Sequence, residues 1–201
     1  MNGLFVSFEG PEGAGKSTQV ELLREALARH RPVVVREPGG TPLGEQIRRL
    51  LLESRLEMSP EAEMYLFMAA RAELVDRVIA PALRRGGVVI ADRYHDSTLA
   101  YQGGGRGADT LWPESFPRPD LTFLLVLPVE VGLRRQARAG KRADRIESEA
   151  LPFHRALMAE YQRLATAEPQ RYVRIEADRP AADVHAQVLA RVMPLLQGVA
   201  T

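Results

Sequence analysis

The sequence predicts a single doubly wound α/β domain, in which helices cover both faces of a parallel sheet. Short apolar runs alternate with helical patterns along the chain, and a glycine-rich loop joins the first run to the first helical pattern. The length of 201 residues is enough for one such domain with a full core, so we expect residues 1–201 to form one unit. The apolar runs, interpreted as buried strands, are residues 4–8, 33–35, 88–91, 121–127 and 172–175.

Residues 10–17 read Gly-Pro-Glu-Gly-Ala-Gly-Lys-Ser, which fits the phosphate-loop (P-loop) pattern. An apolar run precedes this loop, and Val20, Leu23 and Leu27 follow it at helical spacing. The glycines let backbone N–H groups wrap a phosphate, and the helix adds its positive N-terminal end. We therefore expect a bound nucleoside triphosphate. The residues expected to hold ATP are Gly10, Pro11, Glu12, Gly13, Ala14, Gly15, Lys16, Ser17 and Thr18.

Composition excludes several classes of protein. The chain is 45% hydrophobic and 26% charged, as in an ordinary soluble globular protein. Its net charge of +1 argues against broad electrostatic binding to nucleic acid or a membrane surface. With no cysteine, disulfides and thiolate zinc sites are excluded, and the four histidines lack metal-ligand spacing. No signal segment or long apolar stretch is present, so we expect the cytoplasm, no nucleic-acid partner and no membrane association.

The second apolar run ends in residues 36–41, Arg-Glu-Pro-Gly-Gly-Thr. Proline and two glycines stop any regular element there, so a loop leaves the carboxyl end of the strand. Ligands bind at that end of an open α/β sheet. Residues 44–53 then predict a short helix, with its apolar residues facing inward and Arg48 available to point elsewhere.

A long helical pattern covers residues 60–85, with Ser59 as N-cap and Pro60 in the first turn. The third apolar run follows and ends in Asp92-Arg93-Tyr94. An apolar strand that ends in Asp is typical of the second phosphate-binding element, whose carboxylate acts near the metal. Residues 101–107 come next and are too glycine-rich for an ordinary helix interior.

A basic segment precedes two further helices, which are expected over residues 151–167 and 182–196. Taken alone, such a segment most often forms a solvated face or a nucleic-acid patch. Its six basic residues are Arg134, Arg135, Arg138, Lys141, Arg142 and Arg145.

These motifs, in this order, together with Ala69-Ala70-Arg71, the Tyr-Gln-Gly-Gly-Gly-Arg-Gly run at 101–107 and Asp-Arg-Ile-Glu at 144–147, resemble those of thymidylate kinase. The resemblance runs from residue 4 to about residue 178. It implies transfer of the γ-phosphoryl group of ATP to dTMP, giving dTDP and ADP with Mg²⁺. It also implies a homodimer and a five-stranded parallel sheet.

The resemblance implies roles for individual side chains. Phe67 would stack on thymine, Arg71 would donate to a thymine carbonyl, and Gln102 would bind the base edge. Phe67 and Arg71 are four positions apart and share one helix face, which independently supports one ring-sized site. The full substrate-binding set would be Glu12, Arg36, Pro38, Arg48, Phe67, Arg71, Arg93, Ser97, Tyr101 and Gln102.

Within this set, Arg36, Arg48 and Arg93 would hold the phosphate of dTMP. Glu12 would contact the sugar hydroxyl, and Tyr101 would pack beside the deoxyribose and disfavour a 2′-hydroxyl. The implied metal set is Ser17, Asp92 and Glu9, and the implied catalytic set is Lys16, Arg93, Arg145 and Glu12.

The third variable position of the phosphate loop separates two forms of the family, and one form carries an arginine there. This chain has Gly13, so it resembles the bacterial form, in which arginines of a lid contact the phosphates. We expect the lid at about residues 134–147, with Arg145 the best match and Arg138 and Arg142 the next candidates. Phosphoryl transfer needs alignment and positive charge, and an arginine supplied on closure also excludes water.

Two alternative functions stay open at this point. One is a phosphate-loop kinase for another nucleotide or nucleoside, against which the combination of Phe67, Arg71 and Gln102 argues. The other is a nucleotide-dependent switch that hydrolyses ATP slowly and binds a protein partner. Arg106, within the glycine-rich run, is compatible with either a structural or a functional role.

Overall fold

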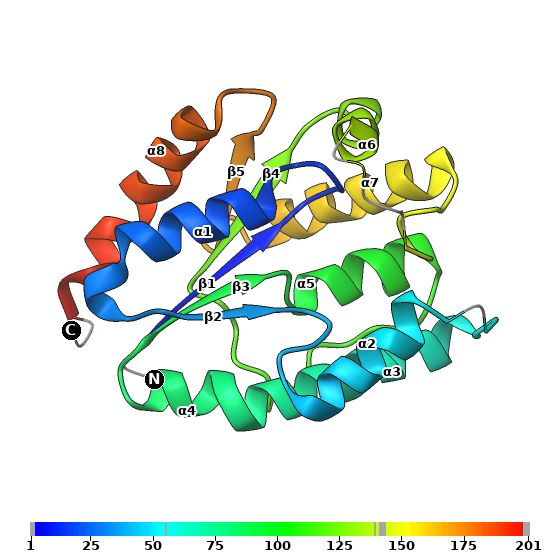
Figure 1. Cartoon of the computed structure of the whole chain (residues 1–201), viewed down its shortest axis with the longest axis horizontal. Coiled ribbons are helices and arrows are strands. Elements are labelled where there is room, and N and C mark those ends of the chain that lie inside the picture. The colour runs from blue at the N-terminus through cyan, green and yellow to red at the C-terminus, as the bar shows by residue number, and fades with distance from the viewer. Residues whose placement is uncertain (1–2, 55, 139, 141–143, 199–201) are drawn as a thin grey trace.

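The computed structural model describes residues 3–54, 56–138, 140 and 144–198 and contains one five-stranded, all-parallel sheet (Figure 1). The strand order is β2-β3-β1-β4-β5, so the fold predicted from the sequence is confirmed. The strands are β1 Leu4–Glu9, β2 Val33–Arg36, β3 Val88–Asp92, β4 Leu121–Val126 and β5 Tyr172–Glu176.

The register of the strands brings their carboxyl ends to one edge of the sheet. Phe8 of β1 and Arg36 of β2 both pair with Asp92 of β3, and Glu9 pairs with Leu124 of β4. Because parallel strands all run the same way, the loops that leave these ends lie beside one another. The phosphate loop, the loop after β2 and Arg93 therefore share one edge.

Helices cover both faces of the sheet. The helical elements, with the short turns labelled η, are α1 Lys16–Ala26, η1 Ala28–His30, α2 Pro42–Leu52, α3 Pro60–Leu74, η2 Val75–Ile79, α4 Ala80–Arg84, α5 His95–Thr98, η3 Leu99–Gly105, α6 Val129–Arg138, α7 Leu151–Ala167, α8 Ala181–Val192 and η4 Met193–Gly198. Helices α1 and α8 lie on one face of the sheet, whereas α4 and α7 lie on the other (Figure 1).

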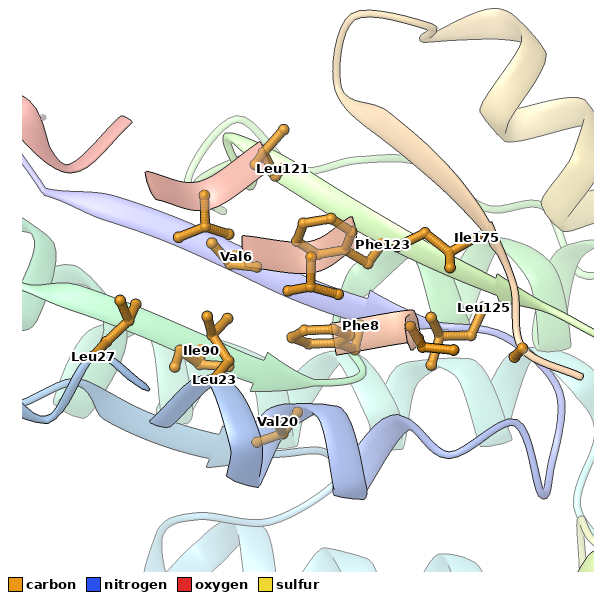
Figure 2. Packing of buried hydrophobic residues seen from close by; sticks show 14 of the residues in the cluster. Val6, Phe8, Val20, Leu23, Leu27, Ile90, Leu121, Phe123, Leu125 and Ile175 are labelled. Atoms are coloured by element: carbon orange, nitrogen blue, oxygen red, sulfur yellow. The ribbon is translucent and has the colours of Figure 1, made fainter. Parts of the chain in front are cut away.

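Alternate strand residues supply the two cores. Val6 and Phe8 of β1 and Phe123 of β4 point toward α1 and α8, where Leu23 packs against them (Figure 2). Phe5, one residue out of step, points to the opposite face and packs against α3, η2 and α4. These side chains are almost completely buried, and each contributes about 1.5–3 kcal/mol by leaving water.

The helix expected over residues 60–85 is divided into three parts. Ser59 caps its start as predicted, because its Oγ accepts a hydrogen bond from Ala62 N at 3.2 Å. The α-helical pattern then gives way to the π-helical turn η2 and resumes as α4. The apolar pattern of the sequence did not indicate this turn, which runs over Val75–Ile79.

The glycine-rich run forms π-helical turns in η3 and not a loop. Its glycines lie against neighbouring side chains: a Cβ on Gly103 or Gly105 would be less than 3.0 Å from Thr110 or Phe153. The glycines thus serve close packing of η3 against α7 and residues 106–120. No helix in the described ranges is long and apolar enough to cross a membrane.

Candidate active site

A cavity of about 380 Å³ opens at the carboxyl edge of the sheet. It is lined by the phosphate loop, by residues of α3 and η3, and by arginines from β2, from α2 and from the position directly after β3. Most residues expected at the site from the sequence meet here. The lining residues are Glu12, Gly13, Gly15, Lys16, Ser17, Thr18, Arg36, Glu37, Pro38, Arg48, Leu52, Phe67, Arg71, Asp92, Arg93, Ser97, Thr98, Tyr101, Gln102, Arg135, Gln136, Asp144, Ile146 and Glu147.

The phosphate loop has the backbone conformation that its sequence requires. Gly10, Gly13 and Gly15 have φ of 135°, 71° and 87°, in the region that favours glycine. Lys16 Nζ donates to the carbonyl oxygens of Gly10 at 3.1 Å and Pro11 at 2.8 Å. Burial, followed by the charge of Arg93, lowers the pKa of Lys16. The two hydrogen bonds hold the ammonium group inside the loop. A bound phosphate would replace the two carbonyl oxygens as its partner.

Ser17 and Asp92 form a pair of oxygen donors beside the loop. The Ser17 hydroxyl donates to Asp92 Oδ2 at 2.6 Å, and both side chains line the cavity. Mg²⁺ prefers hydroxyl, carboxylate and phosphate oxygens and keeps several of its waters. The pair fits such an ion when a nucleotide supplies the remaining oxygens.

Arg93 joins the phosphate loop to the wall of the cavity. Its guanidinium forms an ion pair with Glu12 and donates to Gly10 O at 3.2 Å, while its backbone has a φ of 70°. This conformation costs a non-glycine residue about 1–2 kcal/mol. Burial opposes ionisation of Glu12, but the charges of Arg93 and Lys16 outweigh it and lower the pKa to about 2. Tyr101 Oη also donates to Glu12, at 3.1 Å.

Glu9, which the resemblance places around Mg²⁺ or its waters, is completely buried. Its carboxylate accepts hydrogen bonds from Tyr94 N at 2.8 Å, the Ser97 hydroxyl at 2.6 Å and the Tyr161 hydroxyl at 2.8 Å. Burial, followed by the charge of Asp96, raises the pKa of Glu9 to about 7. With its oxygens occupied, Glu9 supports the start of α5 from below and does not line the cavity among the described residues.

Arg71 at the base end is bonded more tightly within the protein than the sequence indicated. Its Nε donates to Glu37 Oε2, its Nη1 donates to Thr98 and His95 Nδ1, and its Nη2 donates to Tyr94 O. The guanidinium also forms an ion pair with Glu37 through Nη2. Arg71 still lines the cavity, where it remains the expected donor to a base.

Thr98 is a lining residue that sequence reasoning missed. Its Oγ1 accepts from Arg71 at 2.8 Å, which leaves its own hydroxyl hydrogen available to a carbonyl in the cavity. Thr98 stands four positions before Gln102, so the two occupy one face of continuous helical turns. The spacing of four positions from Gln102 is the sequence signal that could have indicated Thr98.

Arg145, which the sequence predicted to contact the phosphates, contacts other protein groups in the structure. Its Nη2 donates to Glu63 Oε2 at 2.5 Å and its Nε donates to Leu51 O at 2.9 Å. Among the described residues, Arg145 does not line the cavity, whereas its neighbours Asp144 and Ile146 do. The local reason is Glu63, a buried carboxylate that needs a cation and that the sequence did not single out.

The other basic residues of the segment also fall into distinct places. Arg135 of α6 lines the cavity and donates to Ala177 O at 3.0 Å and to Asp178 Oδ1 at 2.9 Å. Arg138 is exposed at the end of α6. Arg142, which the sequence offered as a further candidate, lies outside the described residues.

Helix α6 packs directly on the phosphate loop through two glycines. A Cβ on Gly13 would be less than 3.0 Å from Gly132 O, and a Cβ on Gly132 would be less than 3.0 Å from Glu12 O. An arginine at position 13 is therefore incompatible with α6 in this position. The glycine that the sequence associated with lid arginines is also the one that allows α6 to approach.

The fold and the cavity together define a P-loop enzyme that transfers a phosphoryl group to a small acceptor. A phosphate loop and an aspartate at the end of a neighbouring strand form the donor end, and an arginine-lined pocket faces them.

Comparisons with known proteins identify the family. The thymidylate kinase family model matches residues 8–188. The chain is 48% identical to a thymidylate kinase of Thermomicrobium roseum, over 96% of both proteins. It is 46% identical to that of Deinococcus radiodurans, over 94% of this chain and 96% of the relative. The crystal structure of the Ehrlichia chaffeensis thymidylate kinase superposes with a TM-score of 0.74 at 28% identity, covering 94% of this chain and 98% of that one. The chain belongs to the thymidylate kinase family.

The contact between Gly13 and Gly132 generates a prediction. Alanine favours a helix over glycine by about 1 kcal/mol, yet Gly132→Ala would push α6 against Glu12 O. We expect a several-fold rise in the KM for ATP and a lower kcat, measured by steady-state kinetics. Ala137→Gly, at an exposed position of α6, is the matched control: it should lower the melting temperature and leave the KM for ATP unchanged. Wild-type kinetics in Gly132→Ala would contradict the contact.

His95 generates a pH prediction. Burial, followed by the charge of Arg71, lowers its pKa to about 3 from an ordinary 6.5. Between these values the unfolded chain binds a proton that the folded protein does not, so this group makes the free energy of unfolding fall as pH falls. Chemical denaturation of wild type and His95→Gln should show wild type losing about 1 kcal/mol more between pH 6 and pH 5. The titration of Glu9 contributes equally to both proteins and does not affect the difference between them. Parallel plots of the free energy of unfolding against pH would contradict the prediction.

Proposed function

We propose that this cavity carries out ATP-dependent phosphorylation of dTMP to dTDP, with ATP at the phosphate-loop end and dTMP at the α3–η3 end. One observation carries the proposal: a single cavity is lined by the phosphate loop, by Phe67 and Gln102, and by Arg36, Arg48 and Arg93. These groups match the parts of the two substrates, which are a triphosphate, an acceptor phosphate and a base.

The reaction is an in-line displacement at the γ-phosphorus of ATP. An oxygen of the dTMP phosphate forms a bond to that phosphorus while the bond to the bridging oxygen of ADP breaks. The acceptor phosphate is already a competent nucleophile, so no general base is needed. Catalysis then consists of alignment and of positive charge on the transferring group, supplied by Lys16 and Arg93.

On the donor side, Lys16 would exchange its bonds to the Gly10 and Pro11 carbonyl oxygens for bonds to the β- and γ-phosphates. Ser17 and Asp92 would hold Mg²⁺. When bound, the ion neutralises phosphate charge and fixes the orientation of the triphosphate. Arg135, which the loop after β5 holds at the cavity wall, would flank the donor nucleotide.

On the acceptor side, Arg36, Arg48 and Arg93 would hold the phosphate of dTMP, and Pro38 and Ser97 would line its site. Tyr101 stands beside the expected sugar position, fixed by its hydrogen bond to Glu12 and by Arg93 over its ring at 5.0 Å. This fixed ring would leave no space for a 2′-hydroxyl. Glu12 remains ionised at neutral pH and would accept from the 3′-hydroxyl.

Two further features of this proposal, the lid and the homodimer, come from the family resemblance. Residues 134–147 would act as a lid on a single kinase domain spanning residues 1–201. The protein would act in the cytoplasm as a homodimer. Exposed apolar side chains of α2 and α3, which pack side by side, would suit the dimer contact: Leu43, Leu50 and Tyr65.

The proposed function is tested by ADP release with Mg²⁺-ATP against dTMP, dUMP, dGMP, dCMP, AMP and thymidine. We expect a high rate with dTMP, a lower rate with dUMP and background rates otherwise. Equal rates across acceptors would indicate a kinase with a broader acceptor site. ADP release that is independent of any acceptor would favour a nucleotide-dependent switch protein.

The position of Arg145 yields a prediction about the lid. Because its guanidinium is bonded to Glu63 and Leu51, we expect transition-state charge to come from another arginine of the segment, such as Arg138. Arg138→Ala should lower kcat by roughly 10²-fold, as losses of transition-state charge do, with the KM for dTMP little changed. Arg145→Ala should instead change the KM for dTMP. A kcat loss confined to Arg145→Ala would restore the role expected from the sequence.

A further inference from the structure

Glu63 of α3 is a buried carboxylate directly behind the base end of the cavity. Its side chain is 1% exposed, its Oε1 accepts from Gln102 Nε2 and Arg106 Nε, both at 2.8 Å, and its Oε2 accepts from Arg145 Nη2 at 2.5 Å. Burial favours the neutral acid, but the hydrogen bonds from Gln102 and Arg145 and the charge of Arg106 outweigh it and lower the pKa of Glu63. Glu63 is therefore ionised at neutral pH and can only accept hydrogen bonds.

An ionised neighbour determines which end of the Gln102 amide faces it. Only the NH₂ group can donate to the Glu63 carboxylate, so Nε2 lies on that side and Oε1 is turned away. Gln102 lines the cavity, and within the described part of the chain no group donates to its Oε1. The base end of the cavity thus presents a hydrogen-bond acceptor whose orientation is fixed from behind.

We propose that Glu63 is a specificity-determining residue, which selects bases that carry N–H at ring position 3 by orienting the Gln102 amide. The proposal rests on the proposed function, because it takes the base of dTMP to lie against Gln102. Thymine and uracil carry a hydrogen on N3 and can donate to Gln102 Oε1. Cytosine has a lone pair on N3, so two acceptors would face each other in a site closed to water, which costs both groups a hydrogen bond.

Without Glu63, Gln102 alone would not discriminate between these bases. A free glutamine amide turns over and offers either its carbonyl oxygen or its NH₂ group. Glu63 removes one of these choices. Glu63 does not itself line the cavity among the described residues, so it is a positioning residue that acts through Gln102.

The arginines around Glu63 make its buried charge tolerable. Arg106 also donates to Glu149 Oε1 at 2.8 Å, and Arg145 also donates to Leu51 O at 2.9 Å, so both guanidinium groups are held on two sides. A buried carboxylate without such partners would become neutral, and a neutral acid could donate as well as accept. This arrangement gives Arg106 and Arg145 a shared purpose: they keep Glu63 ionised.

The test is the ratio of kcat/KM for dTMP to that for dCMP in wild type, Glu63→Gln and Arg106→Lys. In Glu63→Gln, the new amide oxygen can accept from the arginines while its NH₂ group donates to Gln102 Oε1, which turns the Gln102 NH₂ toward the base. We expect the ratio to fall about tenfold or more, with the KM for ATP unchanged. Arg106→Lys keeps a positive charge beside Glu63 and leaves the Gln102 contact in place, so its ratio should stay near that of wild type.

A second variant keeps the proposal testable if Glu63→Gln does not fold. Gln102→Met has nearly the same shape and no hydrogen-bonding group, so it should lower the same ratio about tenfold. Adding Glu63→Gln to Gln102→Met should then have no further effect on the ratio. Binding of dCMP too weak for turnover can be followed by the fluorescence of Trp112, whose ring contacts His95 at 4.6 Å beside Arg71.

The outcomes separate the two proposals. A folded Glu63→Gln or Gln102→Met that keeps the wild-type ratio would overturn the role of Glu63. An equal fall of the ratio in Arg106→Lys would also overturn it, since general loosening of the site would then explain the effect. Failure of the proposed function would appear in wild type itself, as the absence of any preference for dTMP over dCMP.

Discussion

The parallel pairing of β1 with β3 places the phosphate loop beside Asp92 and Arg93, and the rest of the cavity depends on that pairing. Phe8 stands opposite Asp92, and the backbone N–H of Arg93 donates to Phe8 O at 3.0 Å. The carboxyl ends of the two strands therefore lie side by side. Ser17, the second residue of α1, then reaches Asp92. A shift of this register by one residue would turn the Asp92 side chain to the opposite face of the sheet.

Buried charge pairs make the walls of the cavity rigid. Glu37 holds Arg71, Glu12 holds Arg93 and Glu63 holds Arg145, in each case between different elements of the fold. Removing such groups from water is costly, and their mutual attraction together with further hydrogen bonds offsets that cost. The benefit for catalysis is preorganisation, because donors and acceptors are already oriented when the phosphates arrive. Neutral groups alone would leave the orientation of Gln102 undetermined.

The contact between α6 and the phosphate loop explains a choice of residue that the sequence shows without its reason. Gly13 at the third variable position permits the backbone of Gly132 to lie against it, so the helix that begins the basic segment starts at the loop itself. A larger residue at either position would hold the helix away. The absence of an arginine from the loop and the close approach of the helix therefore have the same steric cause.

The sequence by itself determined the sheet, the phosphate loop and most residues around the cavity, because these depend on local patterns: apolar runs, loop glycines and strand-end motifs such as Asp92-Arg93. Tertiary structure decided what each charged side chain contacts. Arg145 was expected at the phosphates and instead pairs with Glu63. Glu9 accepts a hydrogen bond from Tyr161, and Thr98, which lines the cavity, was overlooked. A charged side chain pairs with whichever opposite charge the fold buries nearby, and sequence spacing does not reveal partners that are 82 or 152 positions away along the chain.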